Sequence, residues 1–282
     1  MSDVPVIADP AAMSAWSEAA RGQGERIALV PTMGALHKGH LSLVLQAWRR
    51  AQKVVLSIFV NPMQFGPQED LAKYPRDLPG DLAKAASVGC DLAFVPEAAS
   101  MYSPDFQTAI EVREVSQGLC GARRPGHFVG VATVVCKLLN IVRPHIALFG
   151  EKDFQQLAVI RRMVADLNLP VEIVGVPTVR EPDGLALSSR NAYLSALDRQ
   201  RAGALFTGLS AAKALVEKGE RRASVLLAAA TAEIAGRVDR IDYIEVRAAD
   251  DLKPLDTVDR PAVILVAAFV GGTRLIDNLR LG

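Results

Sequence analysis

Short apolar segments alternate with helix-like segments through the first 176 residues of this 282-residue chain. Five of them are strand-like because they are short, apolar or β-branched, and separated by helical patterning. They cover residues 27–30, 54–60, 92–95, 146–149 and 171–176. This alternation predicts βαβ units that form a parallel sheet with right-handed crossovers. Ligands of such sheets bind beyond the carboxyl ends of the strands, so polar residues there are site candidates.

The pattern changes after Val176. Two Ala-rich segments predict helices, three apolar segments predict strands, and Gly271-Gly272 between the last two strands is a hairpin signal. These segments cover residues 196–218 and 223–238 for the helices, and 241–246, 262–270 and 273–278 for the strands. We therefore predict an α/β chain with a parallel-sheet domain over residues 1–176 and a smaller α+β domain over residues 177–282.

The amino-acid composition limits the kinds of partner that this protein can have. The formal net charge of +1 argues against a dedicated nucleic-acid binder, because such proteins usually carry a basic face. No uninterrupted apolar run reaches membrane-spanning length, so we expect no membrane partner. Three cysteines without a CxxC pair, and an N-terminus without an export signal, predict reduced thiols and a cytoplasmic location.

His37 and His40 lie at a strand-to-helix junction, between the 27–30 segment and an apolar run from Leu41. Imidazoles three residues apart share one helix face, and the start of a helix favours an anion. Gly39 leaves room for a phosphate near the backbone. The pattern therefore predicts a triphosphate site. Two alternatives are a zinc site, which would need a third ligand that is not nearby in the sequence, and a pair of turn caps.

Two further groups of polar residues are candidates for the same phosphate site. Ser188, Ser189 and Arg190 offer several donors to phosphate oxygens, although a helix cap or a solvated turn is also consistent with them. Lys152 lies at the start of the helix predicted over residues 153–167, where a polyphosphate would bind. Asp153 is equally consistent with a helix cap and with a functional group.

Three further segments are open to two interpretations. Asn61 and Gln64 follow the second strand and either bind a small substrate or close a turn. Residues 69–81 are consistent with a lid that places Asp81 near a magnesium ion. For most of these residues a solvated surface loop is the simpler interpretation. Residues 123–128 either close over a substrate or form a basic surface turn.

Together these motifs closely resemble the pantothenate synthetases, which are pantoate–β-alanine ligases of the nucleotidyltransferase superfamily. The resemblance runs from about residue 7 to 278, and its motifs are residues 31–40, 57–66, 126–128, 149–156 and 188–191. It implies a Rossmann-like N-terminal domain, a C-terminal domain that closes over ATP, and a homodimer. It also implies that ATP and pantoate form pantoyl adenylate and pyrophosphate with Mg²⁺, and that β-alanine then yields pantothenate and AMP.

The resemblance also implies the site residues. The catalytic set is His37, His40, Lys152 and Arg190. The ATP set is Met33, His40, Gly150, Lys152, Asp153, Ser188, Ser189 and Arg190. The pantoate and β-alanine set is Phe59, Asn61, Gln64, Tyr74 and Gln156, with Met33 also in the pantoate pocket wall. Family members often have two adjacent acids near the metal, whereas here Gly80 precedes Asp81, which leaves Asp81 as the candidate metal ligand.

Three rival functions share parts of this pattern. A nucleotidyltransferase would stop after transferring a nucleotidyl group, and an aminoacyl-tRNA synthetase would need a basic tRNA-binding extension that this neutral chain does not show. A nucleotide-sensing module without catalysis would bind ATP through the same polar groups. These functions differ in which acid must be present before pyrophosphate exchanges into ATP, so an exchange assay distinguishes them.

Overall fold

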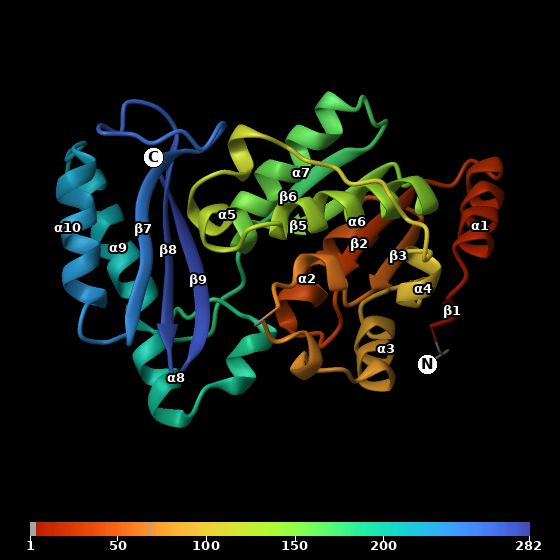
Figure 1. Ribbon diagram of the computed structural model, residues 1–282, viewed down its shortest axis with the longest axis horizontal. Coiled ribbons are helices and arrows are strands. Elements are labelled where there is room, and N and C mark those ends of the chain that lie inside the picture. The colour runs from red at the N-terminus through yellow and green to blue at the C-terminus, as the bar shows by residue number, and fades with distance from the viewer. Residues whose placement is uncertain (1–3, 68) are drawn as a thin grey trace.

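The computed structural model describes residues 4–67 and 69–282. Figure 1 shows two lobes, with the N-terminal residues in one and the C-terminal strands in the other. The N-terminal lobe contains a parallel six-stranded sheet in the order β1-β4-β3-β2-β5-β6. Its strands are β1 (Val6–Ile7), β2 (Ile27–Thr32), β3 (Lys53–Ile58), β4 (Leu92–Phe94), β5 (Ile146–Gly150) and β6 (Glu172–Val176). The five predicted strands are confirmed; β1 was missed because two residues carry no periodic pattern.

Helices cover both faces of this sheet. They are α1 (Pro10–Gly22), α2 (Lys38–Trp48), α3 (Leu78–Ala86), α4 (Ala98–Met101), α5 (Leu119–Arg123), α6 (His127–Val142) and α7 (Phe154–Asp166). Successive residues of β2 point to opposite faces. Ile27 and Leu29 pack in the core with α1, α6 and α7, whereas Ala28 and Val30 pack with α2 and α3. Burial on both faces explains why β2 is a continuous apolar run in the sequence.

Short 3₁₀ turns connect several of these elements. They are η1 (Pro62–Gln64), η2 (Leu71–Lys73), η3 (Glu114–Ser116), η4 (Glu151–Asp153) and η5 (Ser189–Tyr193). Two of them, η1 and η4, follow the carboxyl ends of β3 and β5. The predicted site residues of these segments therefore lie at one edge of the sheet.

The C-terminal lobe has three helices and an antiparallel sheet in the order β7-β8-β9. The elements are α8 (Ala196–Ala202), α9 (Ala204–Glu217), α10 (Ala223–Ile234), β7 (Arg240–Ala248), β8 (Ala262–Val270) and β9 (Thr273–Leu281). The hairpin is confirmed, since Gly271 and Gly272 have φ values of 56° and 76°. The single helix expected over residues 196–218 is wrong. Gly203, which favours helix ends, donates to Gln200 O at 3.3 Å and separates α8 from α9.

Strand β8 is buried on both of its faces and contributes to two cores. Val263, Leu265 and Ala267 pack with residues of the N-terminal lobe, including side chains of α6 and α7. Ile264 and Val266, which alternate with them, pack against α9 and α10. The period-2 geometry of a strand thus places one row of side chains in each core.

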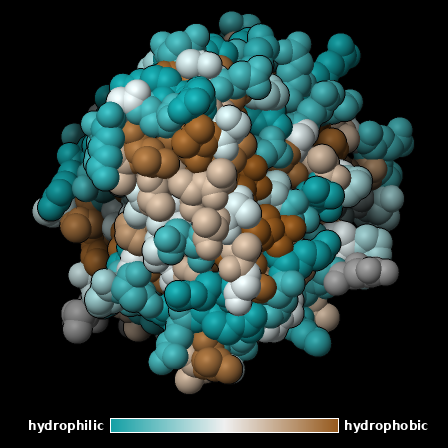
Figure 2. All heavy atoms as spheres, turned by 90° about the vertical axis from the view of Figure 1, so that its left-hand side faces the viewer, coloured by the Kyte–Doolittle hydropathy of each residue, from teal (hydrophilic) through white to brown (hydrophobic). Residues whose placement is uncertain are grey.

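Figure 2 shows the end of the molecule formed by the C-terminal lobe, where hydrophilic residues surround a central group of apolar ones. No helix in the described part of the chain combines the length and the apolarity that crossing a membrane requires. The described fold is thus an α/β sheet with helices on both faces, joined to a small α+β lobe, as the sequence predicts.

Candidate active site

Two cavities meet at the carboxyl edge of the parallel sheet. The smaller, of about 230 Å³, is bordered by the start of α2, and the larger, of about 630 Å³, lies between the two lobes. Lys152, Asp153, Gln156, Ser188 and Arg190 belong to the walls of both, so the cavities adjoin. The smaller cavity is lined by every predicted site residue except Asp81: Met33, His37, His40, Phe59, Asn61, Gln64, Tyr74, Gly150, Lys152, Asp153, Gln156, Ser188, Ser189 and Arg190.

His37 and His40 cap the start of α2. Nδ1 of His37 accepts from Gly39 N at 3.1 Å, and Nδ1 of His40 accepts from His37 N at 3.4 Å. The two rings stack with centroids 4.1 Å apart. The capping interpretation is therefore confirmed, and both rings also line the smaller cavity. An acceptor Nδ1 places the proton of a neutral ring on Nε2, which makes Nε2 a hydrogen-bond donor.

Burial keeps both rings neutral. Desolvation, followed by the charge of Lys152, lowers the pKa of His37 from 6.5 to about 4. Desolvation, followed by the neighbouring His37 and by Lys152, lowers the pKa of His40 to about 3. At neutral pH the two histidines can therefore donate hydrogen bonds to phosphate oxygens, while the positive charge comes from Lys152.

The Ser188–Arg190 turn lines the smaller cavity together with the histidines. Oγ of Ser188 accepts from Arg190 N at 3.2 Å and caps η5, so the cap interpretation is also right for this residue. Arg190 forms a bidentate ion pair with Asp70, at 3.0 Å from Nε and 2.8 Å from Nη2. Residues about 150 positions apart thus share one cavity, as a common phosphate site requires.

Lys152 lies in η4, just beyond Gly150 at the end of β5. Its side chain is 18% exposed, with Nζ 3.9 Å from a carboxylate oxygen of Asp153. Asp153 is at the N-cap position of α7 but makes no side-chain capping bond, and it lines both cavities. Of the two interpretations of Asp153, the structure therefore favours a group that faces the cavity.

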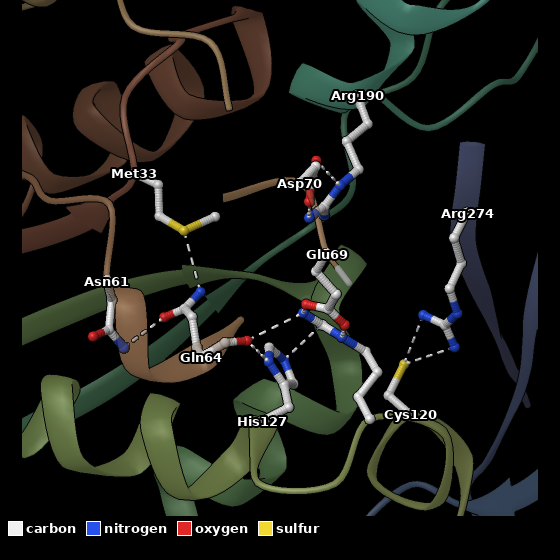
Figure 3. Close-up of polar contacts among 10 residues, drawn as sticks. Met33, Asn61, Gln64, Glu69, Asp70, Cys120, His127, Arg190 and Arg274 are labelled. Atoms are coloured by element: carbon white, nitrogen blue, oxygen red, sulfur yellow. Dashed lines mark hydrogen bonds and ion pairs between the residues drawn. The ribbon is translucent and has the colours of Figure 1, made fainter. Parts of the chain in front are cut away.

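The turn after β3 contributes further lining residues, and Figure 3 shows the contacts among Asn61, Gln64 and Met33. Nδ2 of Asn61 donates to Oε1 of Gln64 at 3.0 Å, and Nε2 of Gln64 donates to Sδ of Met33 at 3.2 Å. Asn61 is 1% exposed, and its Oδ1 accepts from the hydroxyl of Tyr102 at 2.8 Å. Asn61 therefore closes the turn and orients the Gln64 amide, and both line the cavity. Phe59, which is buried, contributes an apolar part of the same wall.

Two neighbouring acids each hold an arginine of another segment (Figure 3). Glu69 pairs with Arg124 at 2.7 and 2.6 Å, and Asp70 pairs with Arg190. Arg124 also donates to Nε2 of His127 at 2.9 Å. The surface-loop interpretation is wrong for Glu69 and Asp70, and the surface-turn interpretation is wrong for Arg124, because each lines a cavity and is partly buried.

Asp81 lies behind the histidine loop, outside the cavity walls. It is 1% exposed, and its two oxygens accept from Ala35 N at 2.8 Å and Leu36 N at 2.7 Å. Residues 4–67 and 69–282 contain no group of three or more His, Cys, Asp or Glu side chains that could hold a metal ion. Magnesium is often held by only one or two protein carboxylates, so the metal role of Asp81 stays a prediction.

Other supporting residues were not predicted. Gln155, next to Gln156, is buried and accepts from Cys120 N at 3.0 Å, which fixes α5 against α7. Nδ2 of Asn278 donates to the carbonyls of Glu151 and Lys152, each at 2.9 Å, and so ties β9 to η4. Polar and apolar residues are mixed along β9, so nothing local marked Asn278, and its partners are more than 100 residues away.

A second polar group lines the larger cavity (Figure 3). The thiol of Cys120 lies 3.2 Å from the hydroxyl of Tyr243 and 3.5 Å from Nη1 of Arg274. Nε of Arg274 also donates to Asp242 at 2.9 Å. These contacts join α5 of the N-terminal lobe to β7 and β9 of the C-terminal lobe.

Relatives with this sequence pattern are known. A family model described as pantoate-beta-alanine ligase matches residues 5–280. A pantothenate synthetase from Myxococcus xanthus is 58% identical over 270 residues, which are 95% of this chain and 92% of that protein. Another from Anaeromyxobacter dehalogenans is 56% identical over an alignment of 288 positions that covers 100% of both chains.

Solved structures share the fold as well. A crystal structure of pantothenate synthetase from Thermus thermophilus superposes with a TM-score of 0.92 at 45% identity, covering 98% of this chain and 99% of that one. A pantoate-beta-alanine ligase from Francisella tularensis, complexed with beta-gamma ATP and beta-alanine, has a TM-score of 0.83 at 34% identity, covering 98% and 97%. This chain belongs to the pantoate–β-alanine ligase family of enzymes.

Proposed function

We propose that this chain condenses pantoate with β-alanine at the expense of ATP, through a pantoyl-adenylate intermediate. The observation that carries the proposal is that His37, His40, Lys152 and the Ser188–Arg190 turn line one cavity. Two neutral donors, a cation and a guanidinium around one space suit a triphosphate. The family to which the chain belongs supports the choice of acid and amine.

The first step activates the acid. A carboxylate oxygen of pantoate bonds to the α-phosphorus of ATP, the bond to the bridging oxygen of pyrophosphate breaks, and pyrophosphate leaves. Nε2–H groups of His37 and His40 stabilise the charge on the phosphate oxygens, and Lys152 and Arg190 neutralise it. Such a transfer needs positioned reactants and electrostatic stabilisation more than a protein nucleophile.

The second step forms the amide. The free amine of β-alanine bonds to the acyl carbon, the bond from that carbon to AMP breaks, and the amine releases its proton. Gln64 and Gln156 hold pantoate through hydrogen bonds beside the apolar side chain of Phe59, with Met33 in the same wall and Asn61 and Tyr74 at the pantoate and β-alanine region. The ATP set adds Gly150, Asp153, Ser188 and Ser189.

Pyrophosphate exchange tests the proposal. We expect labelled pyrophosphate to enter ATP when pantoate is present and β-alanine is absent, because adenylation precedes amine attack. Exchange that requires an amino acid or tRNA instead would contradict the proposal, and so would a stable nucleotide-linked end product.

Three further parts of the proposal rest on the resemblance and on the cysteine pattern. Mg²⁺ would accompany ATP, held mainly by phosphate oxygens, since this metal often keeps few protein ligands. The chain would form a homodimer and act in the cytoplasm. Sedimentation at micromolar concentration tests the dimer, and a monomer there would contradict it.

A further inference from the structure

Ala35 and Leu36 are the two residues before His37. Side chains of other residues form hydrogen bonds with the N–H and the carbonyl group of both. The N–H groups of Ala35 and Leu36 donate to Oδ2 and Oδ1 of Asp81 at 2.8 and 2.7 Å. Nζ of Lys84 donates to Leu36 O at 3.1 Å, and Oγ of Ser189 donates to Ala35 O at 3.2 Å. The path of the chain into the histidine turn is thus set by side chains and not by a sheet or helix ladder.

Asp81 is the central member of this set. Its carboxylate is 1% exposed and is matched by the two loop N–H groups and by Nζ of Lys84 at 3.8 Å. A buried carboxylate is costly unless such partners satisfy it, so the loop and the carboxylate hold each other in place. The loop also needs holding, because Ala35 has a φ of 51°, which residues other than glycine rarely adopt.

We propose that Asp81 is a positioning residue for His37 and His40, acting through the backbone of Ala35 and Leu36 and not as a metal ligand. The inference rests on the proposed function, in which the two histidines stabilise the transferring phosphate. Both oxygens of Asp81 point to the loop, and the residue lies outside both cavity walls. Lys84, one helical turn later on α3, acts with it on Leu36.

The proposed role predicts which kinetic constant changes. His37 is the N-cap of α2, so a shift of the loop before it moves both imidazoles relative to the phosphate. Phe59 and Gln64 of the pantoate wall lie after β3 and in η1, and neither is a partner of the Asp81 carboxylate. Removing the anchor should therefore slow adenylation and leave pantoate binding nearly unchanged.

Asp81→Asn is the main test variant. The Asn side chain has one acceptor atom, Oδ1, where the Asp carboxylate has two. One of the two loop N–H groups would therefore face the side-chain NH₂ group, which is itself a donor. We expect kcat for pantoate-dependent pyrophosphate exchange to fall on the order of 100-fold, as a displacement of about 1 Å can cause, with KM for pantoate within about twofold. Raising Mg²⁺ should not restore the rate. The amide proton signals of Ala35 and Leu36 should move upfield in the NMR spectrum, a readout independent of activity.

Asp77→Asn is the matched control. Asp77 caps α3 through Gly80 N at 3.0 Å and is not a partner of Ala35 or Leu36. Asn can still cap the helix, so the variant removes a carboxylate charge from the same helix start without removing a loop contact. Lys84→Gln is the second variant if Asp81→Asn does not fold. It removes one loop bond, and we expect kcat to fall ~3- to 10-fold with KM for pantoate unchanged.

Several outcomes would overturn the inference. They are recovery of Asp81→Asn by excess Mg²⁺, an equal loss in the Asp77→Asn control, unshifted Ala35 and Leu36 amides, and a raised KM for pantoate at normal kcat. Absence of pantoate-dependent exchange in the wild-type protein would instead refute the proposed function. In that case, shifted amide signals would still show that Asp81 holds the loop.

Discussion

Oγ of Ser189 donates a hydrogen bond to the carbonyl oxygen of Ala35 at 3.2 Å. This contact joins the turn after β6 directly to the loop that leads into the histidines. Ser189 also lines the smaller cavity, so one hydroxyl lies beside both the loop and the proposed phosphate position.

Replacement of Ser189 by Ala should lower the rate of adenylation. The change removes a loop contact and a phosphate donor, and each hydrogen bond of this kind contributes about 0.5–1.5 kcal/mol. We expect kcat for exchange to fall ~10-fold or more with KM for pantoate little changed. Ser195→Ala is the control, because Ser195 caps α8 in the same lobe and lines neither cavity. An equal loss in both variants would contradict the role of Ser189.

Replacement of His40 by Ala should affect chemistry far more than binding. Loss of one donor to a developing phosphate charge costs on the order of 100- to 1,000-fold in rate. Single-turnover adenylation and calorimetric pantoate binding measure the two effects separately. His145→Ala is the control, since His145 bonds to Ile27 N at the opposite edge of the sheet. Equal losses of rate and of pantoate affinity would count against a transition-state role for His40.

The stability of the protein should fall as the pH drops from about 6.5 towards 4. Burial lowers the pKa of His37 and His127 to about 4 and that of His40 to about 3, so the unfolded chain takes up these protons first. Between these pH values the unfolded state binds protons that the folded state does not bind, and this difference lowers the free energy of unfolding.

Thermal unfolding at pH 7.5 and pH 5 measures this effect. His40→Gln should reduce the difference in Tm between the two conditions, because an amide does not titrate. A Tm difference in His40→Gln as large as that of the wild-type protein would show that other groups cause the acid sensitivity.

Replacement of Asp277 by Ala should destabilise the fold strongly. Asp277 is 3% exposed and accepts a bidentate pair from Arg180 at 2.6 and 2.8 Å. Breaking a buried pair leaves a charge without its partner and costs ~3–5 kcal/mol of unfolding free energy. Glu172→Ala is the control, since the exposed pair of Glu172 with Arg26 should contribute less than about 1 kcal/mol. Urea unfolding with similar losses in both variants would contradict the prediction.

The sequence was sufficient to predict the parallel sheet and the convergence of its polar segments. Strand patterns are local, and the rule that ligands bind at the carboxyl edge then brings His40 and Lys152 towards one place. Arg190 lies beyond the last strand of this sheet, and the family resemblance was what assigned it to the same site. Propensity misjudged the region around Gly203, where one glycine outweighs an otherwise continuous helical pattern.

The partners of charged side chains could not be predicted in the same way. Glu69 and Asp70 resemble a solvated loop because their arginines lie 55 and 120 residues away. Asp81 lies in the first turn of α3, where an acidic residue is common. Its hydrogen-bond donors become visible only once α3 is packed against the histidine loop. Such contacts depend on tertiary placement, which periodicity does not encode.

Strand β8 has a consequence for folding cooperativity. Its two rows of side chains are shared between the cores, so melting of either lobe alone would expose Val263 and Leu265, or Ile264 and Val266, to water. Such a half-folded species is unfavourable, and the whole molecule should therefore denature in a single all-or-none transition.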